Sequence, residues 1–225
     1  LTRSAKDASD IMVDDLERRH ALQGRLSGIE TPFKKLNEYT NGLQFEEQTV
    51  IGARPSQGKT ALSLNIVEHA CFKNRVPTLF VTLEMSVAAL MRRLASSWTG
   101  IPLEVIKKGS YTDRDFKKFT DFRMMSAKAP WWTIDAVGGI GLNKLCAAIR
   151  RRVRKDKIKL VIIDYLQKIK SNEKHEKRTY EVAEVSMQLK SMAVKTGVCM
   201  VTLAQLNRES EKDKTPRPPR LSDLA

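Results

Sequence analysis

Short apolar runs alternate along the chain with segments whose apolar residues recur at helical spacing. The apolar runs predict strands at residues 48–53, 77–83, 131–134, 160–164 and 198–203. The helical spacing predicts helices at residues 59–71, 87–98, 141–155 and 180–196, with a mixed, largely helical region at residues 101–130. Strands that alternate with helices form parallel sheets covered on both faces, because each crossover places a helix on a face. The pattern therefore predicts an α/β fold with a mostly parallel central sheet flanked by helices.

A further helix is predicted near the N-terminus, over residues 4–26. Ser4, followed three residues later by Asp7, is a capping-box pattern. The apolar stripe of this helix is thin and repeats every fourth residue, at Ala8, Met12 and Leu16. A helix this polar is poorly stable alone. We therefore expect it to dock on another subunit or on its own domain; the alternative is a frayed chain end.

The composition is that of one main folded domain. Of the 225 residues, 41% are apolar and 29% are charged, which excludes a disordered chain, and no apolar run of about 18 residues could span a bilayer. The three histidines are scattered, and so are the three cysteines, Cys71, Cys146 and Cys199. This spacing supports neither a disulfide framework nor a structural zinc site. We expect a soluble cytoplasmic protein without a membrane partner.

Positive charge is unevenly distributed along the chain. There are 40 Lys and Arg against 26 Asp and Glu, a formal net charge of +14. Thirteen basic and four acidic residues lie between Lys144 and Arg178. Such a concentration favours a polyanionic partner, either nucleic acid or an anionic membrane surface. The alternative is a solvated basic helix and loop without a partner.

A phosphate-binding pattern joins the first predicted strand to the following helix. It matches the P-loop signature GxxxxGK[ST], except that alanine replaces the first glycine. In this context backbone N–H groups surround phosphates, Lys59 reaches the β and γ oxygens, and the Thr60 hydroxyl joins the Mg²⁺ shell. We therefore expect a nucleoside triphosphate with Mg²⁺ at Ala53, Arg54, Pro55, Ser56, Gln57, Gly58, Lys59 and Thr60.

Three polar residues follow other predicted strands. Because the carboxyl ends of parallel strands meet at one edge, Asp164, after the run LVII, is expected beside the P-loop as an Mg²⁺ ligand. Glu84 could orient and deprotonate the water that attacks the γ-phosphate; alternatively it caps or begins the next helix. Gln205 is placed where an amide could sense the γ-phosphate, and the alternative is a solvated loop glutamine.

Four motifs together carry a resemblance to a known family. They are ARPSQGKT, LEMS at residues 83–86, IDYLQ at residues 163–167 and QLNR at residues 205–208. In this order they resemble the C-terminal RecA-like ATPase domain of replicative hexameric DNA helicases of the DnaB type, from bacteria or phages. Matching segments extend from Gly28 to Leu224, nearly the whole chain. In that family the P-loop alanine is usual.

The resemblance implies a RecA-like P-loop NTPase motor domain at residues 29–225, preceded by a linker helix at residues 1–28 that docks on the neighbouring subunit. We expect the C-terminal end of the family domain, with its arginine finger, to be absent. Catalytic roles are implied for four residues: Lys59, Glu84, Arg93 and Gln205. Arg92 stands beside Arg93, so either of these two arginines could be the one that serves the site. Gln205 would couple the state of the γ-phosphate to the DNA loops.

The same resemblance implies the activity and the partners. Such a motor hydrolyses Mg-ATP, translocates on single-stranded DNA with 5'-3' polarity and unwinds duplex as a homohexamer, with a primase and a helicase loader as partners. It would work in a bacterial cell or a phage-infected host. The family places a channel-facing loop after the Walker B strand, which in this sequence is the run LVIID at residues 160–164. DNA phosphates are therefore expected at Lys168, Lys170, Lys174, Lys177 and Arg178. Because no aromatic residue interrupts this segment, we expect contacts to the DNA backbone rather than base stacking.

Some features and functions stay open. Residues 150–159 either line a subunit contact or are solvated, and the pair Trp131-Trp132 favours a core role over a stacking platform. One rival function is a recombination or repair ATPase that forms filaments on DNA, against which the motifs LEMS, IDYLQ and QLNR argue. The other is an ATP-gated DNA-binding module without useful hydrolysis, against which Glu84 argues.

Overall fold

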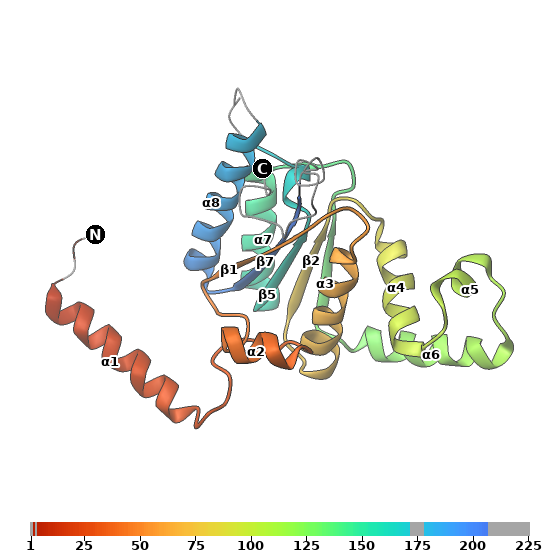
Figure 1. Cartoon of the computed structure of the whole chain (residues 1–225), viewed down its shortest axis with the longest axis horizontal. Helices are drawn as coiled ribbons and strands as arrows, with labels where there is room; N and C mark the ends of the chain where they lie inside the picture. Colours follow the sequence, from red (N-terminus) through yellow and green to blue (C-terminus); the bar gives the residue numbers. More distant parts are fainter. Residues whose placement is uncertain (1, 3, 172–177, 207–225) are drawn as a thin grey trace, which may run out of the picture.

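The fold is built on one parallel sheet. The computed structural model describes residues 2, 4–171 and 178–206 (Figure 1). Five strands lie in the spatial order β1-β7-β5-β2-β3 and all neighbours are parallel. Their bounds are β1 Gln48–Ala53, β2 Thr78–Thr82, β3 Trp131–Asp135, β5 Leu160–Asp164 and β7 Cys199–Gln205. The α/β prediction and all five predicted strands are confirmed.

Helices cover both faces of the sheet, since side chains of successive strand residues point to opposite faces. Val161 and Ile163 of β5 pack on one side with the helices α7 and α8, while Ile162 packs on the other side with α3 and α4 (Figure 1). The covering helices are α3 Lys59–Val67, α4 Val87–Thr99, α6 Asp113–Ala127, α7 Leu142–Asp156 and α8 Arg178–Thr196. The predicted helix at residues 59–71 is α-helical only to Val67 and continues as a π-helix, η1 Glu68–Lys73.

Some short elements lie outside the predicted pattern. The mixed region at residues 101–130 contains α5 Leu103–Lys108 ahead of α6, and α5 projects from the body together with the N-terminal half of α6 (Figure 1). The C-terminal half of α6 packs on the core through Phe122. A seven-residue helix, α2 Lys34–Thr40, begins beside a buried pair in which the Asn37 side chain hydrogen-bonds the backbone and hydroxyl of Thr31. Two-residue strands form a second small sheet, β4 Ile140–Gly141 with β6 Ile169–Lys170.

The tryptophan pair of β3 belongs to the core, as predicted. Trp131 meets the Phe72 ring edge-on, with ring centres 6.1 Å apart, on the α3 side of the sheet. Trp132 packs on the opposite side, against the cluster formed by α7 and α8. Adjacent strand residues therefore anchor both layers, and neither ring forms a free stacking surface.

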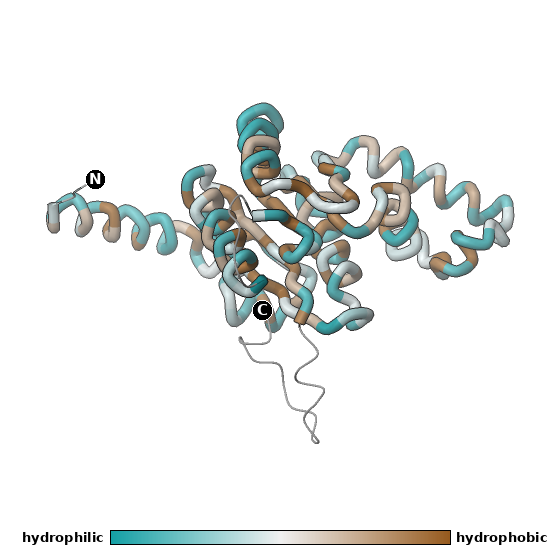
Figure 2. Tube along the Cα trace, turned by 90° about the horizontal axis from the view of Figure 1, so that it is seen from above, coloured by the Kyte–Doolittle hydropathy of each residue, from teal (hydrophilic) through white to brown (hydrophobic). Residues whose placement is uncertain are grey.

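The N-terminal helix, α1 Ala5–Ala21, extends away from the body of the molecule (Figures 1 and 2). Its capping box is present: the Ser4 hydroxyl accepts from the N–H of Asp7 and the Asp7 carboxylate accepts from Ser4. None of its residues is buried, and Met12 and Leu16 are more than half exposed. The prediction that it docks on its own domain is wrong, because no residue of α1 is buried and its side chains only line a hollow beside Phe45. Docking on another subunit stays a prediction.

The helix ends earlier than predicted. Residues 23 and 24 adopt positive φ angles of 47° and 82°, which terminate the α-helix after Ala21. Among the described helices, none combines the length and the apolar character that crossing a bilayer requires.

Candidate active site

The loop between β1 and α3 has the backbone conformation of a phosphate-binding turn. Gly58, the N-cap of α3, lies in the left-handed region at φ 80°, and Ser56 does so at φ 61°. A Cβ built on Gly58 would meet no atom within 4 Å, so glycine is favoured there by backbone conformation rather than by space. The first turn of α3 presents backbone N–H groups to this loop, which makes it suitable for binding an anion.

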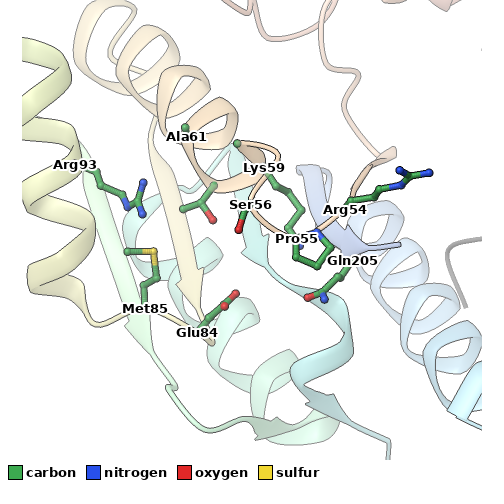
Figure 3. A pocket seen from close by; sticks show the side chains of 11 residues that line it. Arg54, Pro55, Ser56, Lys59, Ala61, Glu84, Met85, Arg93 and Gln205 are labelled. Carbon is green, nitrogen blue, oxygen red and sulfur yellow. The ribbon is translucent and has the colours of Figure 1, made fainter. Parts of the chain in front are cut away.

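Side chains from four separate segments meet at a cavity of about 410 Å³ beside this loop (Figure 3). Lys59 and Thr60 come from α3, Glu84 from the turn after β2, Arg93 from α4, and Gln205 from the end of β7. Much of the P-loop lines it as well: Arg54, Pro55, Ser56 and Gly58. The structure therefore brings together the residues that the sequence placed at one edge of the sheet, and only Ala53 and Gln57 of the P-loop lie outside the lining.

Asp164 lies beneath the cavity, at the carboxyl end of β5. Its side chain is buried, and the Thr60 hydroxyl donates a hydrogen bond of 2.6 Å to Oδ2. Burial raises the pKa of Asp164, while the Thr60 bond and the Lys59 charge oppose this rise. The second oxygen, Oδ1, has no hydrogen-bond partner among the described residues. A hydroxyl and a carboxylate with a free oxygen match the hard oxygen ligands of Mg²⁺, so the predicted ligand pair fits that ion.

Lys59 extends from the first turn of α3 into the cavity, near the carboxylates of Asp164 and Glu84. Burial lowers the pKa of Lys59, and the negative charges of Asp164 and Glu84 counteract this effect. The ammonium group is thus influenced by two negative charges but forms no close ion pair, since no carboxylate oxygen of the described residues lies within 4.0 Å of it.

Glu84 is held in the turn between β2 and α4 and does not cap the helix. The N-cap of α4 is Ser86, whose hydroxyl accepts from the N–H of Ala89 at 3.3 Å. The turn is fixed by a hydrogen bond from the Thr82 hydroxyl to the carbonyl of Met85. The alternative role of Glu84 as a cap or first-turn acid is therefore wrong, and its carboxylate is exposed at the cavity (Figure 3).

The arginine position that the sequence left open is resolved by the orientation of α4. Arg93 is half-buried and lines the cavity, whereas Arg92 is exposed and lies outside its lining. The positive charge of Arg93 also acts on the carboxylate of Asp164. Arg93 is thus the arginine of α4 that faces the site.

Gln205 is the last residue of β7 and is half-buried, so the alternative of a solvated loop residue is wrong. Its backbone is bound by Gln167, to which the sequence alone assigned no role. Gln167 lies in the 3-10 turn η2 Leu166–Lys168, which follows β5. Its place at the end of the IDYLQ motif was the available signal, but contacts between residues so far apart in sequence cannot be seen in a motif.

In the basic segment, residues 168–178, the residues that the structure describes are 168–171 and 178, and none of these lines the cavity. Lys168 is in η2, Lys170 is in β6, both are exposed, and Arg178 is the first residue of α8. The segment expected as a loop thus begins as a turn and a short strand. Lys174 and Lys177 lie outside the described residues.

Similarity to known proteins identifies the family of this site. Residues 28–225 match the family described as DnaB-like helicase C terminal domain. The chain belongs to this family. Its fold is that of the RecA-like ATPase motor domain of replicative DNA helicases, and nucleotide use follows from the family.

Curated relatives of this DnaB-like domain are replicative helicases. The chain is 35% identical over 218 residues to the replicative DNA helicase DnaB of Leifsonia xyli subsp. xyli, covering 97% of the chain and 47% of that protein. It is 33% identical over 223 residues to DnaB of Geobacillus stearothermophilus, covering 97% of the chain and 49% of that protein. The chain therefore spans about half the length of these relatives.

Solved structures give the same result. A structure described as an ATPase domain superposes with a TM-score of 0.88 at 27% identity, covering 99% of this chain and 78% of that chain. A DnaB-like replicative helicase described with its interactions with primase gives a TM-score of 0.82 at 27% identity, covering 100% of this chain and 53% of that chain. The predicted RecA-like fold is confirmed.

Proposed function

We propose that the chain is the ATP-hydrolysing motor of a replicative DNA helicase that moves 5'-3' along single-stranded DNA and unwinds duplex as a homohexameric ring. The observation that carries the proposal is the cavity at which Lys59, Thr60, Glu84 and Gln205 meet above the buried Asp164. Membership of the DnaB-like family supports the choice among P-loop ATPases.

Each residue at the cavity has a separate task in the proposed hydrolysis. The P-loop backbone and the ammonium of Lys59 bind the β- and γ-phosphate oxygens of ATP. Thr60 and Asp164 would hold Mg²⁺, which neutralises phosphate charge when bound. Glu84 orients the attacking water and accepts its proton. Arg93 supplies positive charge on the α4 side, and Gln205 contacts the γ-phosphate from the β7 side.

The proposed DNA contact is made by the basic segment after β5. Lys168, Lys170 and Arg178, together with Lys174 and Lys177, bind the phosphates of one strand. A primase and a helicase loader are the proposed protein partners, in the cytoplasm of a bacterial cell or of a phage-infected host. The primase is supported by the structural relative, a DnaB-like replicative helicase whose interactions with primase have been described.

The decisive experiment measures ATP hydrolysis by the full-length protein with and without single-stranded DNA, alongside its mass in solution with Mg-ATP. Stimulation by DNA together with a six-subunit mass is the expected result. A filament, or hydrolysis that DNA does not stimulate, would favour a recombination or repair ATPase. Turnover that persists in Glu84→Gln would remove Glu84 from the reaction, whereas retained nucleotide binding with lost turnover would exclude a binding module.

A further inference from the structure

Gln167 joins the end of β7 to the beginning of the basic segment. Its side-chain oxygen accepts a hydrogen bond of 3.1 Å from the N–H of Gln205, and its side-chain NH₂ donates one of 2.9 Å to the carbonyl of Gln205. One amide thus satisfies both backbone groups of a residue 38 positions away. Lys168, the first residue of the basic segment, follows Gln167 directly.

The sheet leaves these backbone groups of Gln205 available on one side. The pairing of β5 with β7 ends at Ile163 and Thr202, whereas the pairing of β1 with β7 continues to Ala53 and Gln205. On the β5 side the last residues of β7 therefore lack a strand neighbour. Because buried or half-buried backbone groups require partners, the Gln167 amide takes the place of the missing strand at this end.

The backbone of Gln167 is tied to the other end of the basic segment. Its carbonyl accepts a hydrogen bond from the guanidinium of Arg178, which also forms an ion pair with Glu181. The Glu181 carboxylate in turn accepts from the backbone N–H of Ser171 at 3.2 Å. Both ends of residues 168–178 are thus connected to one glutamine, whose side chain holds Gln205.

We propose that Gln167 is the positioning residue through which DNA bound at Lys168 and Lys170 moves Gln205 at the cavity. This inference rests on the proposed function. A displacement of Lys168 and Lys170 that also moves the adjacent Gln167 must either pull the end of β7 with it or break the two hydrogen bonds to Gln205. Binding of DNA at these two lysines is thereby converted into a change in the position of the Gln205 amide, which lines the nucleotide cavity.

The test compares Gln167→Met with Gln48→Met in the full-length protein. Methionine keeps the length of the side chain but removes both hydrogen bonds. Gln48 is a matched control because its amide also bridges elements, donating to the Thr202 hydroxyl at 3.0 Å and accepting from the Ser186 hydroxyl at 3.4 Å. Gln48 lies at the amino end of β1, whereas the cavity lies at the carboxyl ends of the strands.

The measured quantity is the ratio of the ATP hydrolysis rates with and without single-stranded DNA. For Gln167→Met the ratio should fall by roughly five-fold or more, the lower end of measured couplings between two protein sites, while Gln48→Met keeps the wild-type ratio. The same two hydrogen bonds should also couple the two binding equilibria, so a non-hydrolysable ATP analogue should no longer tighten DNA binding in this variant. A wild-type ratio in Gln167→Met, or an equal decrease in Gln48→Met, would overturn the inference.

A second variant, Gln167→Glu, keeps the test decisive if Gln167→Met is unstable. If Gln167→Met lowers the Tm much more than Gln48→Met does, Gln167→Glu replaces it, because a carboxylate still accepts from the Gln205 N–H but cannot donate to its carbonyl. The expected loss of stimulation is the same. If DNA does not stimulate ATP hydrolysis by the wild-type protein, the proposed function is overturned and this inference with it. If DNA stimulates the wild type and both Gln167 variants equally, only the inference is overturned.

Discussion

The ammonium nitrogen of Lys59 lies 4.4 Å from the centre of the Tyr165 ring. Lys59 is half-buried, and burial lowers its pKa even though Asp164 and Glu84 act in the opposite direction. A cation over an aromatic face is stabilised by about 0.5–2 kcal/mol, more when it is desolvated. Tyr165 therefore supports the charged lysine inside the cavity without neutralising it, which leaves the ammonium available to phosphate.

Replacing Tyr165 separates the effect of the ring from that of the hydroxyl. Tyr165→Phe should bind ATP as the wild type does, because the ring face remains. Tyr165→Leu should bind it roughly 2–30 times more weakly, the equivalent of the missing cation–π energy. Titration with a fluorescent ATP analogue measures both. Equal affinities for the two variants would show that the ring does not support Lys59.

Removing the P-loop lysine should abolish tight ATP binding, since the ammonium of Lys59 is the group proposed to bind the β- and γ-phosphate oxygens. Lys159→Ala is the matched control, because that lysine lies over the Phe45 ring, away from the cavity. Calorimetric titration of Lys59→Ala and of the control gives the two affinities. An unchanged affinity in Lys59→Ala would disprove the P-loop assignment.

The proposed DNA site predicts a change in salt dependence. Each phosphate interaction that a substitution removes from a single strand should reduce the slope of log K against log salt by about 0.7. Fluorescence anisotropy with labelled single-stranded DNA measures the slope for alanine substitutions at Lys168, Lys170, Lys174 and Lys177. As a control, substitution of four exposed lysines of α5 and α6 should leave the slope unaltered: Lys107, Lys108, Lys117 and Lys118. A slope that changes only in the control would place the DNA site on the projecting helices.

The buried thiols should be chemically inert in the folded protein. Burial raises the pKa of Cys71 and of Cys199 to about 12, so both remain protonated at about pH 8. Because the thiolate is the reactive form, a disulfide reagent should label them slowly in the native state and quickly in guanidinium. The unfolded chain loses these protons first, so the free energy of unfolding should fall as pH rises above about 9. Equally fast labelling in both states would contradict this.

The sequence predicted the features that depend on local pattern. The strand β5 is buried on both faces, and its continuous apolar run identified it; the P-loop was identified by spacing and by the strand before it. The helix α2 could not be predicted, because its start depends on the side-chain bonds between Thr31 and Asn37 rather than on apolar period. The strands of the small sheet have only two residues each, which is too short to show the alternation of apolar and polar residues that predicts a strand.

Within the site, residue types and edge placement were predictable, but side-chain direction was not. Only the orientation of α4 distinguishes Arg93 from Arg92, and only the position of Ser86 excludes Glu84 as a cap. The role of Gln167 could not be predicted, because its hydrogen-bond partner Gln205 lies 38 residues further along the chain. Contacts between distant segments require the folded structure.

The free-standing α1 has a consequence for the solution behaviour of the protein. A helix of 17 residues without a buried side chain is marginal in water, and Met12 and Leu16 are left exposed to it. Its folding is therefore linked to whatever surface covers these side chains. In the proposed ring, a neighbouring subunit would be that surface. Helix content should then rise with protein concentration, and the amide hydrogens of α1 should exchange with solvent within seconds in dilute protein but slowly in the proposed ring, so that this segment would report subunit association.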